Sequence, residues 1–220
     1  MKLSNIVLLA GATLVAGQNW NRTCIITATS DGSDDAPSIR QAFKDCGQNG
    51  NIVFQENTTY NIHTTLQLHN LSNVQVDLKG TLLFSTDVRY WIQHGSYYHF
   101  QNISIAMEFS GQDITIDGHD TGVIDGQGQV WYDLALAIGG LYGRPIPFCL
   151  RNVQNAVAKN FKILQSGKWN FVMVESKNIL VDNIYLSSTS DDYQASFEHQ
   201  CRISQRTNSE IGKPRKSRKY

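Results

Sequence analysis

The sequence predicts an all-β protein, a solenoid built from short strands, on the basis of three observations. Apolar and polar residues alternate over short stretches that end at Asp-Gly corners, most clearly between Ile114 and Asp133. Strands of this kind recur after an Asn or Asp residue, with a period in the low twenties. A single amphipathic helix pattern lies near the N-terminus.

The stretch from Ile114 to Asp133 contains the phrase Ile-Asp-Gly twice, at 116–118 and at 124–126. Alternation places the isoleucines of each strand on one face, and Asp-Gly then supplies the positive φ that a sharp corner requires. Asp117 and Asp125 could be read as paired carboxylates. We interpret them as turn residues whose side chains accept hydrogen bonds from their own backbone.

The repeat consists of an Asn or Asp followed by an alternating strand, and it begins at Asn73, Asp113, Asn155 and Asn178. One coil of a solenoid cannot bury its inward residues alone, whereas stacked coils bury a continuous core. Asn side chains at equivalent corners are then expected to hydrogen-bond along the stack. An antiparallel sandwich, which also contains many short strands, is the alternative.

One helix is expected over Ala36 to Cys46, with Asp35 as its N-cap and Gly47 at its end. Its apolar stripe is expected to cover an apolar surface that would otherwise lie open. The polar and aromatic stretch from Tyr90 to Phe100 predicts a loop or irregular insertion.

The first 17 residues are typical of a secretory signal peptide, with Lys2 followed by an apolar run that is too short to span a bilayer. We therefore expect a secreted, extracellular protein that is not held in a membrane. Four Asn-x-Ser/Thr sequons, which are candidate glycosylation sites, support this expectation: Asn21, Asn57, Asn70 and Asn102.

In an oxidising compartment, the 22-residue separation between Cys24 and Cys46 makes a local disulfide plausible. The pairing of Cys149 and Cys201 stays open. The cysteines show no metal-ligand spacing such as Cys-x-x-Cys, and neither a metal nor a cofactor is predicted.

The formal net charge of zero hides an uneven distribution. From His199 onward there are seven basic residues and one acidic residue, so the remainder carries 12 basic and 18 acidic residues. A basic tail can bind nucleic acid, but a secreted chain rarely meets that partner, and no nucleic-acid binding is predicted. Aliphatic periodicity stops after Ser190, and residues 191–220 are therefore expected to be disordered.

Five segments of the chain are informative when taken together: Gly122 to Asp133, Arg144 to Phe148, Asn152 to Asn155, Asn160 to Phe171 and Glu175 to Tyr185. They resemble the fungal polygalacturonases and their exo-acting relatives, glycoside hydrolases of family 28. The likeness extends from about Cys24 to about Ser190 and is greatest to the exo-acting branch. It implies a right-handed parallel β-helix over 18–190, incomplete here, with one N-terminal capping helix.

The resemblance also implies a secreted monomer that binds pectin or polygalacturonate and hydrolyses α-1,4-galacturonosyl bonds with inversion. Inversion needs one carboxylic acid and one carboxylate base. In the family these groups come from an Asn-Thr-Asp motif and an Asp-Asp pair, while Gly-His-Gly and Arg-Ile-Lys motifs bind the sugar. None of the four motifs occurs in this sequence in its family setting. No catalytic residue is therefore assigned, and we expect a truncated or frameshifted, inactive product.

Some residues near the C-terminus are of the same type as those in the missing motifs but lack the neighbouring residues of these motifs. Asp191 and Asp192 are interpreted as a solvated turn, and His199 and Arg202 as tail residues. Four aromatic residues could stack on sugar rings or anchor loops: Trp131, Tyr132, Tyr142 and Trp169. The competing functions are a non-catalytic pectin-binding β-helix, an exo-rhamnogalacturonase relative and, less favoured by the matching segments, a pectate lyase.

Overall fold

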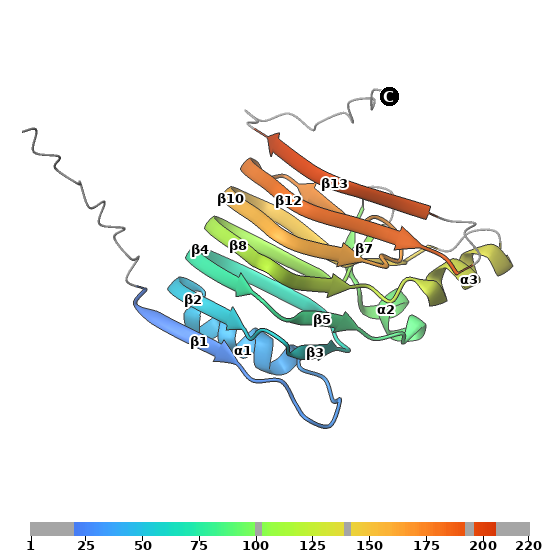
Figure 1. Ribbon diagram of the computed structural model, residues 1–220, viewed down its shortest axis with the longest axis horizontal. Helices are drawn as coiled ribbons and strands as arrows, with labels where there is room; N and C mark the ends of the chain where they lie inside the picture. The colour runs from blue at the N-terminus through green and yellow to red at the C-terminus, as the bar shows by residue number, and fades with distance from the viewer. Residues whose placement is uncertain (1–19, 100–102, 139–141, 192–195, 206–220) are drawn as a thin grey trace, which may run out of the picture.

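The computed structural model describes residues 20–99, 103–138, 142–191 and 196–205. Its main sheet winds as a right-handed parallel β-helix in which successive coils lie side by side (Figure 1). Six parallel strands follow one another across the stack: β1 (Arg22–Ile26), β2 (Gln48–Phe54), β4 (Leu66–Leu78), β8 (Met107–Asp125), β10 (Phe148–Leu164) and β12 (Lys177–Thr189). Parallel pairing at each step excludes the antiparallel sandwich.

Shorter strands complete the coils. In the main sheet β3 (Thr59–Ile62) pairs with β5 (Thr81–Phe84), and β11 (Phe171–Val174) pairs with the start of β10. A separate three-stranded sheet consists of β6 (Ser96–Tyr98), β7 (Ile103–Ile105) and β9 (Pro145–Ile146). This second sheet contributes residues to a polar cluster described below.

The coils are held in register by rows of inward-facing apolar side chains. One row crosses five strands and is buried throughout: Ile52, Val76, Ile116, Ala158 and Val181. Aromatic rings form a second row, in which Phe148 lies 5.6 Å from both Phe109 and Phe161 between ring centroids. Each coil therefore buries its apolar face against its neighbours, as expected for a solenoid.

The predicted ladder of corner side chains is confirmed. Asn178 Nδ2 donates to Asn155 Oδ1 at 2.9 Å, and Asn155 Nδ2 donates to Asp113 Oδ1 at 2.9 Å. All three residues have φ between 54° and 58°. Asn and Asp tolerate this left-handed conformation better than other non-glycine residues, which explains their recurrence at corners.

Helix α1 (Ala36–Cys46) covers the end of the stack at the predicted position. Its N-cap residue, Asp35, makes no capping bond and is fully buried. Its carboxyl oxygens instead accept the backbone N–H groups of Thr29 and Asn61, each at 2.7 Å. The expected capping bond is therefore replaced by a tertiary one. The predicted disulfide between Cys24 and Cys46 is present and ties the helix to β1.

The structure contains two helices that the sequence pattern did not predict. Helix α2 (Val88–His94) and strand β6 replace most of the loop expected at Tyr90–Phe100. Asp87 caps α2 by accepting the N–H of Tyr90, and the buried Trp91 anchors it. Helix α3 (Gln129–Ile138) follows the second Asp-Gly corner. Both are short insertions between coils, so the period-two alternation of the strands gives no signal for them.

The expectation of disorder after Ser190 differs from the structure at β13 (Ser196–Gln205). This strand pairs with β12 in antiparallel direction, from Thr189↔Ser196 to Ile179↔Gln205. An unpaired edge strand offers a row of free backbone donors and acceptors, and a polar segment can satisfy them as well as an apolar one. The signal-peptide residues 1–17 and residues 206–220 lie outside the described residues.

Candidate functional site

Three of the four predicted glycosylation sites can be located. Asn21, Asn57 and Asn70 are exposed, and Asn57 and Asn70 sit at corners with positive φ. Asn102 lies outside the described residues. These three side chains are therefore accessible enough to carry a glycan. That they are glycosylated stays a prediction.

The two Asp-Gly carboxylates act as turn residues, as predicted. Asp117 accepts the backbone N–H of His119, and Asp125 accepts that of Gln127, both at 2.9 Å. Each is a contact two residues along the chain, which is the local Asx geometry of a tight corner.

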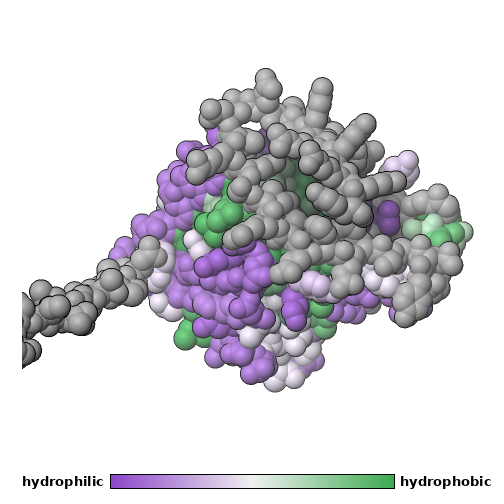
Figure 2. All heavy atoms as spheres, turned by 45° about the horizontal axis from the view of Figure 1, so that its top comes forward, coloured by the Kyte–Doolittle hydropathy of each residue, from purple (hydrophilic) through white to green (hydrophobic). Residues whose placement is uncertain are grey.

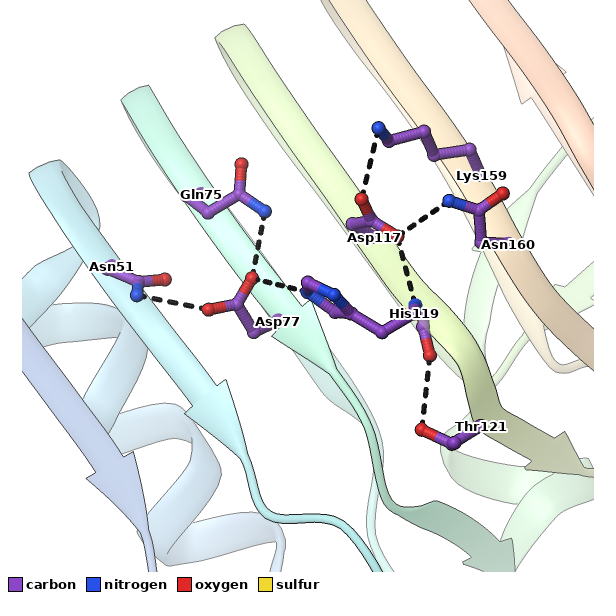
Figure 3. A network of polar contacts seen from close by, with 9 residues as sticks. Asn51, Gln75, Asp77, Asp117, His119, Thr121, Lys159 and Asn160 are labelled. Carbon is purple, nitrogen blue, oxygen red and sulfur yellow. Dashed lines mark hydrogen bonds and ion pairs between the residues drawn. The ribbon is translucent and has the colours of Figure 1, made fainter. Parts of the chain in front are cut away.

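Asp117 also belongs to a polar network on the outer face of the sheet (Figure 3). It accepts from Asn160 Nδ2 at 2.9 Å and lies 3.0 Å from Lys159 Nζ. Beside it, Asp77 lies 2.9 Å from His119 Nε2. Burial alone would raise the pKa of both carboxyls, but these partners together lower it below the usual value. With these partners the carboxylates serve to clamp neighbouring coils.

Two of the candidate sugar-stacking aromatics are buried residues of α3 that anchor this helix. Trp131 is fully buried, and Tyr132 donates its hydroxyl to the backbone oxygen of Ser166 at 2.8 Å. Burial raises the pKa of Tyr132. Tyr142 and Trp169 are exposed and remain available to a ligand.

Trp169 forms a cationic corner with two basic residues. Lys168 Nζ lies 5.1 Å from the centroid of the Trp169 ring. Partial burial and, to a smaller extent, the positive charge of Arg144 lower the pKa of Lys168. A flat aromatic face beside two positive charges is suited to an acidic sugar, which stacks its ring and pairs its carboxylate.

A second polar cluster surrounds Glu108, which is 2% exposed. Its Oε1 lies 2.6 Å from His69 Nε2, and its Oε2 accepts from Ser96 Oγ at 3.0 Å. Arg151 Nη1 lies 3.5 Å from the same Oε2. The Arg151 guanidinium in turn covers the Tyr98 ring at 5.2 Å. Because the buried Glu108 carboxyl contacts side chains from the neighbouring coils, it constrains the relative positions of three coils.

The Glu108 cluster was missed by sequence reasoning. A signal existed, because Glu108 interrupts the otherwise apolar run from Ile105 to Phe109. Its neighbour Cys149 is a buried free thiol. Burial, with a smaller effect of Glu108, raises the pKa of Cys149 to about 12, so this thiol is not a nucleophile at neutral pH.

The last described coil ends beside α3. Ser188 Oγ donates to Asn170 Oδ1 at 3.0 Å, and Asp191 N donates to Gln129 Oε1 at 2.9 Å. Asp191 is an exposed turn residue, as predicted. Asp192 lies outside the described residues, and the side chains of His199, Cys201 and Arg202 are likewise not described.

Within the described ranges, no group of three or more His, Cys, Asp or Glu side chains is arranged to hold a metal ion. No helix in the described part of the chain is long and apolar enough to cross a membrane. Figure 2 shows hydrophilic residues gathered on one flank of the described surface and apolar residues in small separate groups. Scattered exposed apolar residues of this kind are normal for a protein surface.

Comparison with known proteins gives a consistent result. A family profile described as "Glycosyl hydrolases family 28" matches residues 47–209, and thus extends beyond Ser190 into the segment expected to be unrelated. A putative galacturan 1,4-alpha-galacturonidase A of Aspergillus niger is 33% identical over 88% of this chain and 46% of its own length. An alpha-L-rhamnosidase rgxB from the same species is 35% identical over 72% of this chain and 37% of its own length.

Among solved structures, the endo-xylogalacturonan hydrolase of Aspergillus tubingensis superposes with a TM-score of 0.68 and 25% identity. The match covers 77% of this chain and 44% of that chain. The chain thus spans less than half the length of these relatives.

Proposed function

Since this chain belongs to glycosyl hydrolases family 28, we propose that it supplies the substrate-binding coils of an exo-acting polygalacturonase. In this proposal the cationic corner formed by Arg144, Lys168 and Trp169 binds a galacturonate unit. The exo-acting polygalacturonases among the relatives support the proposal: the probable exopolygalacturonase X of Aspergillus flavus is 34% identical over 80% of this chain and 40% of its own length.

The cationic corner carries the proposal. The Lys168 ammonium sits over the Trp169 ring with Arg144 nearby, at the turn that leads into β11. A galacturonate presents both an apolar ring face and a carboxylate, and this corner offers a partner to each. The residues that precede His199 carry a net negative charge, which by itself would repel a polyanion. The positive charge of the cationic corner counteracts this repulsion locally.

We further propose that the 220-residue chain binds pectate without cleaving it. Inverting hydrolysis needs an acid and a base on opposite sides of the scissile bond. None of the four motifs that the family resemblance implies for these groups and for sugar binding occurs in its family setting in the 220 residues. The carboxylates of Asp77 and Asp117 are held in inter-coil hydrogen bonds and serve the fold.

Two measurements test these statements. In an assay of reducing ends released from polygalacturonate, the chain is expected to show no turnover. Hydrolysis that disappears on replacing Asp191 and Asp192 would overturn the non-catalytic assignment. In a titration with trigalacturonate, Lys168→Ala and Trp169→Ala are each expected to weaken binding about 10-fold. Lys162→Ala, which removes an exposed lysine from β10, is the matched control and is expected to bind normally.

A rhamnogalacturonan-binding function is the second candidate, because the relative named alpha-L-rhamnosidase rgxB is 35% identical over 159 residues. The same titration separates the two functions. Tighter binding of a rhamnogalacturonan oligosaccharide than of trigalacturonate would favour the second candidate.

A further inference from the structure

A groove with a volume of about 310 Å³ lies on the outer face of the sheet, at the corner of β8 that follows Glu108. Four corner residues line it, one from each of four successive coils: Asn73, Asp113, Asn155 and Asn178. Because adjacent strands lie about 4.8 Å apart, these side chains present polar groups at regular intervals along the groove. The volume falls at the lower end of the range for small-ligand sites.

The ladder of corner side chains is interrupted inside this groove. Asn73 Nδ2 donates away from the interruption, to Asn49 Oδ1 at 3.0 Å. Asp113 accepts from Asn155 on its other side and has no hydrogen to donate. In the described part of the chain, no hydrogen bond joins Asn73 to Asp113. Two acceptor groups therefore adjoin each other in the groove, and two neighbouring hydroxyls of a ligand can donate one hydrogen bond to each.

Apart from Thr115, the remaining residues that line the groove are apolar. Val157 and Leu180 are adjacent outward residues of β10 and β12, and Leu180 is 37% exposed. The Trp20 indole also lines the groove. One polar edge opposite an apolar floor and an aromatic ring matches a pyranose, which has hydroxyls at its rim and C–H groups on its faces.

The charge of the groove selects among sugars. Asp113 is the sole ionisable side chain among the described residues that line it. A polyanion such as polygalacturonate would meet a carboxylate with no compensating cation. A neutral sugar meets no such penalty and gains charge-assisted hydrogen bonds to the Asp113 carboxylate.

We propose that this groove binds a neutral oligosaccharide, separately from the acidic sugar at the cationic corner. The site would attach the protein to an uncharged polysaccharide while the cationic corner engages an acidic one. The inference does not depend on the proposed function, since the two sites use different residues and ligands of different charge.

The indole N–H signals in a ¹H–¹⁵N spectrum provide the test, because Trp20 and Trp169 report the two sites independently. The probes are cellotetraose, xylotetraose and β-1,4-galactotetraose as neutral sugars, and trigalacturonate as the anion. At least one neutral sugar is expected to shift the Trp20 signal, with a Kd of about 1 mM or below, and to leave Trp169 unmoved. Trigalacturonate is expected to leave the Trp20 signal unmoved.

Two variants sharpen the result. Trp20→Ala is expected to weaken neutral-sugar binding at least about 10-fold, whereas the matched Trp169→Ala leaves it unchanged. Asp113→Asn supplies the N–H that the ladder lacks, so it is expected to raise the melting temperature and at the same time weaken neutral-sugar binding. If Asp113 had a structural role alone, its replacement would change the melting temperature without weakening the binding of neutral sugars.

Three outcomes would overturn the proposal. The first is an unmoved Trp20 signal with all three neutral sugars. The second is competition by trigalacturonate for the same signal. The third is unchanged affinity in both Trp20→Ala and Asp113→Asn, each checked for an intact fold by its dispersed spectrum.

Discussion

His69 and Glu108 are 39 residues apart in the chain, yet Nε2 of the first lies 2.6 Å from Oε1 of the second. The contact bridges β4 and β8, and Ser96 and Arg151 extend it to two further elements. Glu108 is buried, whereas the His69 side chain is 41% exposed. This geometry surrounds a buried carboxyl with one buried partner, Ser96, and two partly exposed ones, His69 and Arg151.

Replacing Glu108 tests its role as a tie between coils. Glu108→Ala leaves the Arg151 guanidinium, the His69 ring and the Ser96 hydroxyl without their shared partner, and is expected to cost about 3 kcal/mol in the free energy of unfolding. Urea denaturation measures this loss. Glu56→Gln, a change at an exposed glutamate, serves as control and is expected to stay within about 0.5 kcal/mol. An equal loss in both variants would contradict a specific role for the buried cluster.

The Asp77 and Asp117 carboxyls predict a sensitivity to acid. Because their pKa values are lowered in the folded state, the unfolded chain binds more protons than the folded one at low pH. Their contribution to stability is therefore complete above the unfolded value of about 3.9 and is lost as pH falls through the lowered pKa. Melting temperatures recorded between about pH 2 and pH 6 should show this fall.

Asp117→Asn is expected to flatten that acid limb while lowering stability at neutral pH, where the ion pair with Lys159 is lost. Asp133→Asn, at an exposed position on α3, is the comparison and should keep the wild-type slope. A slope that Asp117→Asn leaves unchanged would show that other carboxyls dominate the acid response.

The Cys24–Cys46 disulfide closes a loop of 22 residues and fixes the capping helix to β1. For a loop of this length, the double variant Cys24→Ser/Cys46→Ser is expected to be about 3 kcal/mol less stable. Guanidinium unfolding with and without reductant provides the measurement. Reductant should bring the wild-type protein to the midpoint of the double variant and leave the variant itself unchanged. A wild-type midpoint that does not move under reductant would argue against the stabilising effect.

Phe148 occupies the middle of the row of aromatic rings inside the β-helix. Phe148→Ala removes contacts with Phe109 and Phe161 in a site that rigid neighbouring coils prevent from collapsing, and is expected to cost about 4 kcal/mol. Tyr142→Ala, at a side chain that is 80% exposed, should be nearly neutral. Chemical denaturation of the two variants in parallel decides the matter, and a small loss for Phe148→Ala would mean that the coils repack.

Local sequence signals were sufficient to predict the coils. Asn155 and Asn178 stand in the same position of successive repeats, so their hydrogen bond follows from the period alone. The local sequence also predicts that Asp125 accepts a hydrogen bond within its own turn, and that alternate residues of each strand are buried. In each case a few neighbouring residues specify the backbone conformation, and the repeat then brings equivalent positions together.

Other features depend on which segments meet in space. The local sequence predicts that the Asp35 side chain caps α1. In the structure its carboxyl instead accepts hydrogen bonds from the backbone N–H groups of Thr29 and Asn61, and so connects α1 to two other segments. Strand β13 has no apolar period, and it forms because β12 presents an edge that requires backbone partners.

The sequence by itself determined the solenoid, the capping helix, the disulfide and the family, because all of these follow from short-range patterns and from matching segments. The tertiary structure alone decided the Glu108 cluster, the cationic corner at Lys168 and the groove beside Asp113. The Glu108 cluster and the groove depend on side chains from different coils, and the contact between Lys168 and Trp169 depends on the conformation of one loop. The period specifies neither the relative rotation of the coils nor the loop geometry. Their chemistry arises from partners that stacking brings together, and a linear pattern carries no record of those partners.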